Sequence, residues 1–218
     1  MLYLRIVYDN DALQGFRRGW GFACLVGDDL LFDTGANLGV LLYNMNKFEI
    51  DLGEIKRIVF SHEHGDHIGG YEIIENLGNV EVYVPKSFSK HFKKRISSLP
   101  NVVLKEVTKI EEITDKIYTT GELGFFIKEQ SLIIETENGV TLLTGCSHPG
   151  LDKIIRLSSA KINKVSSVIG GFHGFSRLEM LKDLDLIVPC HCTIRKKEIL
   201  RLYSSKSRKC YAGLQLEI

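Results

Sequence analysis

Four potential metal ligands stand within six residues of this 218-residue chain, at His62, His64, Asp66 and His67. They follow the apolar run 58–60, which predicts a buried strand that leads into a glycine-rich turn. Because side chains alternate along a strand, His62 and His64 should face the same side, and the other two should approach from the turn. Imidazole together with carboxylate suits zinc or iron better than magnesium or calcium. The spacing therefore predicts a metal site.

Three later strand ends also carry a histidine or a cysteine beside a turn. The run 140–144 leads into Cys146 and His148, and two later strands lead to His173 and to His191. Strand-end loops on a rigid scaffold commonly carry catalytic residues. His173 stands among glycines that let the backbone approach a bound molecule closely, so it is either a substrate contact or proton donor, or a hydrogen-bonded structural histidine.

Composition narrows the class of protein. Lys and Arg number 28 against 27 Asp and Glu, so the net charge of +1 gives no general pull toward nucleic acid or membrane. No stretch approaches the roughly 20 apolar residues of a membrane span, and residues 1–9 read as a strand rather than a signal peptide. Five irregularly spaced cysteines do not indicate a disulfide framework. We expect a cytoplasmic protein with one domain over 1–218, without nucleic acid or membrane partners; the oligomeric state stays open.

Strands and helices interleave in both halves of the chain, which indicates helices covering both faces of two stacked sheets. Strands are predicted over 2–8, 21–26, 30–33, 56–60, 80–84, 101–107, 116–119, 131–136, 140–144, 165–169, 185–189 and 208–217. Helices are predicted over 37–47, 68–77, 87–98, 150–158 and 194–203. The basic helix 87–98 is either a solvated face or a site for an anionic substrate tail.

The run His62-Glu63-His64-Gly65-Asp66-His67 resembles the H-x-H-x-D-H signature of the metallo-β-lactamase superfamily, and Asp33-Thr34-Gly35 resembles the D-T-G that precedes it. The resemblance implies an α/β protein with the four-layer αββα sandwich of that superfamily. It further implies that His62 and His64 hold one metal and that the Asp66–His67 pair holds a second. Asp33 would then orient the metal loop, whereas a plain turn cap is the alternative.

The same resemblance implies further ligands near the end of the chain. His191 would be the last histidine ligand, and Cys146 stands where a bridging residue would sit. Thr120-Gly121-Glu122 occupies the place of an expected G-H-T, so either His148 or Glu122 could complete the site. A cysteine ligand would favour zinc, and we expect one or two zinc ions, with iron or manganese as alternatives.

Two cysteines flank His191 in the run Pro189-Cys190-His191-Cys192-Thr193. If that segment is extended, Cys190 and Cys192 lie on the opposite side of the chain from the histidine. They are then expected to be packing thiols rather than ligands.

These features together predict a metal-dependent hydrolase of small ester, lactone or phosphoester substrates. A bound zinc, single or in a pair, lowers the pKa of water to roughly 7 and supplies hydroxide, which Asp66 would help to orient. The further motifs T-G-C-S-H-P-G, G-G-F-H and P-C-H-C-T are similar to those of a subfamily that contains an archaeal dihydropterin–ribofuranosylaminobenzene-phosphate synthase. The alternative is therefore a pterin-type synthase, a transferase of tetrahydromethanopterin-like biosynthesis. In either case the partner is a small molecule, and a phosphorylated one is among the candidates.

Overall fold

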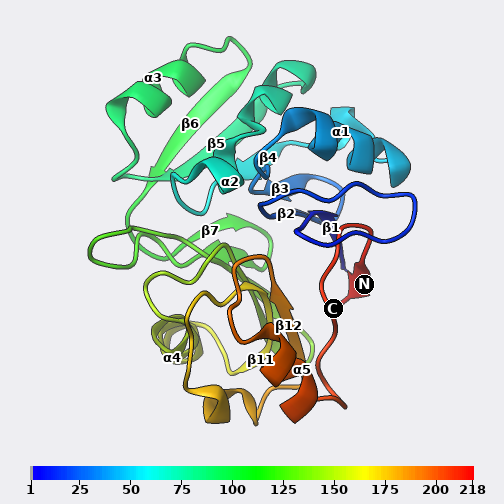
Figure 1. Cartoon of the computed structure of the whole chain (residues 1–218). Helices are drawn as coiled ribbons and strands as arrows, with labels where there is room; N and C mark the ends of the chain where they lie inside the picture. Colours follow the sequence, from blue (N-terminus) through cyan, green and yellow to red (C-terminus); the bar gives the residue numbers. More distant parts are fainter. Residues whose placement is uncertain (1) are drawn as a thin grey trace. The chain divides into compact units, whose positions relative to one another are not determined.

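The computed structural model describes residues 2–218 and divides the chain into two compact units. The first unit runs from the N-terminus to Val107 and includes Tyr211–Ile218, and the second comprises Thr108–Cys210. Each unit contains one sheet with its own helices (Figure 1). The single domain expected over 1–218 stays a prediction.

The first unit is built on a seven-stranded mixed sheet in the order β13-β1-β2-β3-β4-β5-β6. Its strands are β1 (Tyr3–Tyr8), β2 (Ala23–Val26), β3 (Leu30–Phe32), β4 (Arg57–Val59), β5 (Val80–Pro85), β6 (Val102–Val107) and β13 (Gln215–Glu217). Its helices are α1 (Leu38–Lys47), α2 (Gly65–Ile68) and α3 (Lys90–Ser97), with 3-10 turns η1 (Leu52–Glu54) and η2 (Tyr71–Asn76). Strands β3 to β6 are parallel, so their carboxyl ends share one edge of the sheet.

The second unit is built on a six-stranded sheet in the order β12-β11-β10-β9-β8-β7. Its strands are β7 (Glu111–Thr114), β8 (Ile117–Thr119), β9 (Leu132–Thr136), β10 (Gly139–Thr144), β11 (Val165–Gly171) and β12 (Leu186–Cys190). Its helices are α4 (Leu151–Lys161) and α5 (Lys196–Leu202), with the 3-10 turn η3 (Leu178–Leu181). Here β10, β11 and β12 are parallel, so the loops that follow them also leave one edge together.

Each unit buries its own apolar core, which fixes the strands that deliver the candidate site. In the first unit Ile58, Phe60 and Val82 are buried with the apolar faces of the helices. In the second unit Leu142, Val168 and Ile187 come from the three parallel strands and pack with α4 and α5. The strand ends therefore project from rigid supports.

The structure differs from the sequence-based expectation at three elements. The helix predicted over 68–77 is broken into α2 and η2 at Gly69 and Gly70, where the backbone passes too close to neighbouring carbonyls for a side chain. The last strand is confined to β13, and the charged strand β7 was not expected. The strands predicted over 131–136 and 140–144 are confirmed as β9 and β10, which pair as an antiparallel hairpin across Asn138-Gly139. No helix within residues 2–218 is long and apolar enough to cross a membrane.

Candidate metal centre

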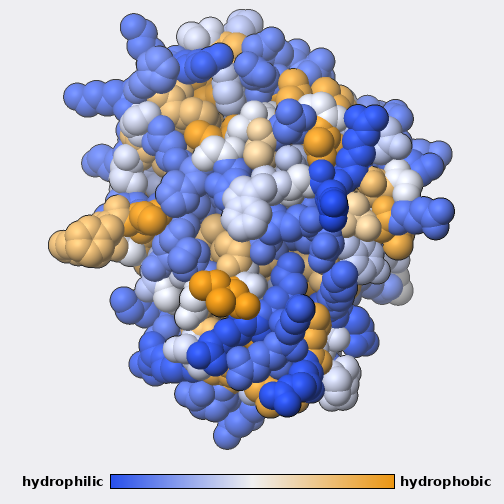
Figure 2. Space-filling model, in the orientation of Figure 1, coloured by the Kyte–Doolittle hydropathy of each residue, from blue (hydrophilic) through white to orange (hydrophobic). Residues whose placement is uncertain are grey.

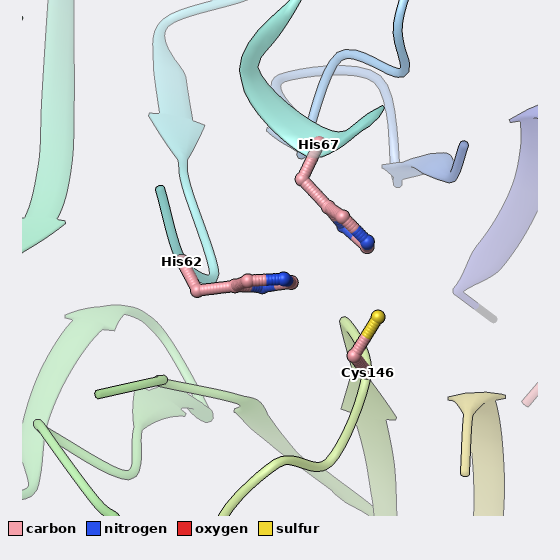
Figure 3. A group of neighbouring side chains, drawn as sticks. All are labelled: His62, His67 and Cys146. Carbon is pink, nitrogen blue, oxygen red and sulfur yellow. The ribbon is translucent and has the colours of Figure 1, made fainter. Parts of the chain in front are cut away.

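The histidine cluster of the first unit lies in the loop after β4 and in α2. His62 Nε2 and His64 Nδ1 are 3.1 Å apart. The ligand atoms of His62 and His67 lie within 4.8 Å of each other, as do those of Asp66 and His67. Figure 3 shows the buried His62 and His67 rings pointing into the same space. The cluster therefore gathers ligand atoms at the separations that a shared metal ion needs.

Asp33 fixes which ring nitrogens can bind a metal. Its buried carboxylate accepts hydrogen bonds from the backbone N and from Oγ of Ser61, each at 2.7 Å, and lies 2.7 Å from His67 Nδ1. Ser61 Oγ also lies 2.8 Å from His62 Nδ1. Since the carboxylate only accepts and the Ser61 proton goes to Asp33, both Nδ1 atoms are donors. In each ring, Nε2 is then the nitrogen whose lone pair a metal would bind.

The Asp33-Thr34-Gly35 loop also holds the backbone of α2. Thr34 donates to the His67 carbonyl through its backbone N at 2.7 Å and through Oγ1 at 3.0 Å. A Cβ on Gly69 would lie 2.5 Å from the Ala36 carbonyl oxygen, so only glycine permits this approach. Asp33 itself has a φ of 57°. The orienting role that the family resemblance implies for Asp33 thus has a structural basis.

Glu63, which lies between His62 and His64 in the sequence, contacts helix α3 instead of the histidine cluster. Its carboxylate accepts hydrogen bonds from the backbone N and from Oγ of Ser89, the N-cap residue of α3. A negative charge is favourable at that helix end. Glu63 therefore anchors the loop to α3, and His64 rather than Glu63 takes part in the cluster.

In the second unit, Cys146, His191 and Cys192 form a group whose ligand atoms lie within 4.8 Å of one another. Cys146 follows β10 and is buried, as is His191 (Figure 3 labels Cys146). The segment after β12 is a turn with His191 at φ 42°, not the extended chain assumed from the sequence. Cys192 consequently lies on the side of Cys146, and a Cβ on Gly171 would meet its Sγ at 2.7 Å. Cys190 is buried, with its thiol 3.2 Å from the Val188 carbonyl.

Glu129 organises the loop that carries Cys146 and His148. Its buried carboxylate accepts from the backbone N of Cys146, Ser147 and His148 at 2.8, 2.8 and 2.9 Å. It also lies 2.8 Å from His148 Nδ1, which leaves Nε2 of this histidine as the lone pair. Sequence reasoning missed Glu129, because the only signal was indirect: a ligating histidine commonly needs a carboxylate or carbonyl on its other nitrogen.

His173 and Glu122 have different surroundings. The His173 ring lies 5.1 Å from the His148 ring, centroid to centroid, and both side chains line a pocket of about 770 Å³ in the second unit. Glu122 pairs with Lys128 at 3.9 Å and belongs to no close group of candidate ligands in the described part of the chain. His148, rather than Glu122, is therefore the better candidate for the open ligand position.

Backbone strain marks the same strand ends. Asp33, Ser147, His173 and His191 follow β3, β10, β11 and β12, and all have φ between 41° and 61°. Residues other than glycine rarely adopt this conformation, which persists only where the surroundings enforce it and often marks functional sites. The imidazoles and carboxylate of the first unit, and the imidazole and thiols of the second, are each donors that suit a metal of the zinc or iron type.

Comparison with known proteins assigns the class. The family model described as Metallo-beta-lactamase superfamily matches residues 24–162. The chain belongs to this superfamily, whose members are mostly metal-dependent hydrolases. The predicted α/β fold of the metallo-β-lactamase type is confirmed by the two sheets with their helices and by the structural matches.

Individual relatives are similar over most of the chain. The 7,8-dihydropterin-6-methyl-4-(beta-D-ribofuranosyl)-aminobenzene-5'-phosphate synthase of Methanocaldococcus jannaschii is 30% identical over 78% of this chain and 76% of its own length. The crystal structure of Tm1679, described as a metal-dependent hydrolase of the beta-lactamase superfamily, matches with a TM-score of 0.85 and 28% identity, covering 100% and 99% of the two chains. YhfI from Bacillus subtilis shares the fold at a TM-score of 0.72 and 13% identity, over the full length of both chains.

Proposed function

We propose that the protein is a hydrolase that uses bound metal to cleave a small ester, lactone or phosphoester. One observation carries the proposal: the Nδ1 atoms of His62, His67 and His148 are held by Ser61, Asp33 and Glu129, so Nε2 is the ring nitrogen that each histidine would offer to a metal. Buried carboxylates placed in this way are typical of metal sites. Superfamily membership supports the same reaction class.

The proposed metal ligands are His62, His64, Asp66 and His67 of the first unit and Cys146, His148 and His191 of the second. Zinc suits this combination of imidazole, carboxylate and thiolate best, as one ion or two, and iron or manganese are the alternatives. When bound, such an ion lowers the pKa of water and polarises a substrate oxygen.

Two side chains are proposed to act on protons. Asp66, in the first turn of α2, would orient the attacking water through its carboxylate as well as ligating. His173 would donate a proton to the leaving oxygen or contact the substrate, a role supported by its exposed ring beside His148 in the same pocket. The pocket size suits a small molecule rather than a polymer.

The cellular setting is part of the proposal. Within residues 2–218 no disulfide joins any of the five cysteines, which favours a reducing cytoplasm. The proposed partner is a small molecule, with no nucleic acid and no membrane.

Hydrolysis of a matched substrate panel tests the proposal. Purified protein would be stripped of metal, reloaded with zinc, iron or manganese, and assayed on esters, lactones, thioesters and phosphodiesters. Metal-loaded protein should exceed metal-free protein on at least one class, and His173→Gln should lower kcat on that substrate by about 100-fold if it transfers a proton. Equal rates with and without metal on every class would refute the proposal.

A second candidate is the synthase reaction, because the relative from Methanocaldococcus jannaschii bears that name and is 30% identical. The expected phosphate contact on α3 has weaker support: Lys93 pairs with Glu106 at 3.0 Å, and Arg95 approaches Glu72 at 3.7 Å. Co-purified pterin, visible by absorbance and fluorescence, would favour this candidate over the hydrolase.

A further inference from the structure

A short loop before β9 presents two phenylalanines to solvent. Phe125 and Phe126 are 83% and 94% exposed, and their rings meet edge to face with centroids 4.9 Å apart. Figure 2 shows mostly polar residues on the visible face, with isolated apolar groups among them. Adjacent exposed aromatic side chains of this kind indicate a binding surface rather than ordinary surface variation.

The base of this loop is closed and tied to a candidate metal ligand. Leu123 and Glu129 exchange two backbone hydrogen bonds, each of 2.9 Å, below the loop. Gly124, at φ 100°, allows the tight return, since a Cβ there would lie 2.3 Å from the Ile127 carbonyl oxygen. Glu129 is also the residue that holds His148. The two ends of the phenylalanine loop are therefore held at a fixed position relative to His148.

The two phenylalanines line the same pocket as the histidines. The cavity of about 770 Å³ is bordered by Phe125, Phe126, His148, His173 and Phe175, all in the second unit. This volume lies within the range of about 300–1,000 Å³ for small-molecule sites, which are commonly lined by aromatic side chains with a few polar groups. Continuity with the two histidines favours a small molecule as occupant over a second protein.

We propose that the substrate carries a flat aromatic group, which packs against Phe125 and Phe126 while its reactive group reaches His148 and His173. Aromatic rings gain from offset or edge-to-face contact beyond the area that they bury, and an alkyl group of similar size does not. The position of the reactive group rests on the proposed hydrolase function, whereas the aromatic contact rests on the loop alone.

Binding of two matched probes tests this inference. Phenylphosphonate and cyclohexylphosphonate share one anionic head group and a six-membered ring of similar size, but only the phenyl ring is flat and aromatic. Calorimetric titration of the metal-loaded protein should give about 10-fold tighter binding of phenylphosphonate. The double variant Phe125→Ala/Phe126→Ala should lose this preference and bind the two phosphonates with equal affinity. Leu202→Ala, an exposed apolar residue on α5, is the matched control and should change neither.

Several results would overturn the inference. The wild type could bind the two phosphonates equally, or fail to bind phenylphosphonate at millimolar concentration. The double variant could also keep the preference unchanged. A dimer of the wild type that dissociates in the double variant would assign the loop to contact between copies instead. If phenylphosphonate binding depends on the phenylalanines but no ester, lactone or phosphodiester is cleaved, the aromatic site stands and the hydrolase proposal fails.

Discussion

At the residue scale, the partners of each imidazole decide which nitrogen is available to a metal. Ser61 Oγ donates a hydrogen bond to Asp33 and accepts one from His62 Nδ1, while Asp33 also accepts one from His67 Nδ1. Glu129 does the same for His148. Each ring is thereby fixed in one tautomer before a metal arrives, which lowers the entropic cost of binding.

Asp33→Asn tests this tautomer selection. An amide keeps the shape of the carboxylate but offers one acceptor oxygen instead of two. The Ser61 backbone N–H at one oxygen, and the Ser61 hydroxyl and His67 Nδ1 at the other, can then no longer all be satisfied. We expect zinc affinity to fall by about 10- to 100-fold, measured by competition with a chromophoric chelator. Asp28→Asn, at an exposed ion pair with Arg5, is the control. Equal zinc affinity in wild type and Asp33→Asn would contradict the role given to Asp33.

Glu129→Gln tests the carboxylate of the second unit. Three backbone N–H groups and His148 Nδ1 share this buried group, and the neutral amide accepts fewer hydrogen bonds, more weakly. We expect the free energy of unfolding to fall by about 2–3 kcal/mol, measured by urea denaturation without metal. Glu122→Gln, which removes the 3.9 Å ion pair with Lys128, should change the free energy of unfolding by less than about 1 kcal/mol. A smaller effect at Glu129 than at Glu122 would show that the carboxylate does not hold the loop.

At the element scale, parallel strands explain why residues far apart in sequence gather within each unit. The segments that follow β3 and β4 carry Asp33 and the Ser61–His62 step. Those that follow β10, β11 and β12 carry Cys146, His173 and His191. Short loops cannot carry these groups far from the common edge. The Asp33 loop then packs on α2 with Tyr8 beneath Gly35, and burial raises the pKa of the Tyr8 phenol so that it stays neutral there.

Gly69→Ala tests the packing of α2 on the Asp33 loop. The new methyl group would approach the carbonyl oxygens of Ala36 and Gly65 to 2.5 Å, and the backbone would have to move. We expect a loss of about 1–3 kcal/mol in unfolding free energy together with weaker zinc binding. Gly78→Ala, where no atom lies within 4 Å of the added carbon, should change stability by about 0.5 kcal/mol or less. A thermal melt of both variants compares them, and equal losses would argue against close packing at Gly69.

At the scale of the whole molecule, features encoded by neighbouring residues could be predicted from the sequence. Contacts between residues far apart in the sequence could not. The histidine cluster was predictable because its ligands fall within six residues after an apolar strand, and the hairpin of β9 and β10 because Asn138-Gly139 is a strong turn signal. Glu129 and Ser61 act on partners that no local pattern reveals. Cys192 turned toward Cys146 because His191 adopts a left-handed φ, which an extended reading of the segment excludes.

Metal content measured by plasma emission spectrometry decides whether the histidine cluster is a metal centre. Protein purified without added metal should contain one or two equivalents of zinc or iron. His62→Ala and His148→Ala should each lose at least half of it, and Leu202→Ala should lose none. A wild-type protein that stays without metal after incubation with excess zinc, or histidine variants that retain the full metal content, would show that these histidines do not form a metal centre.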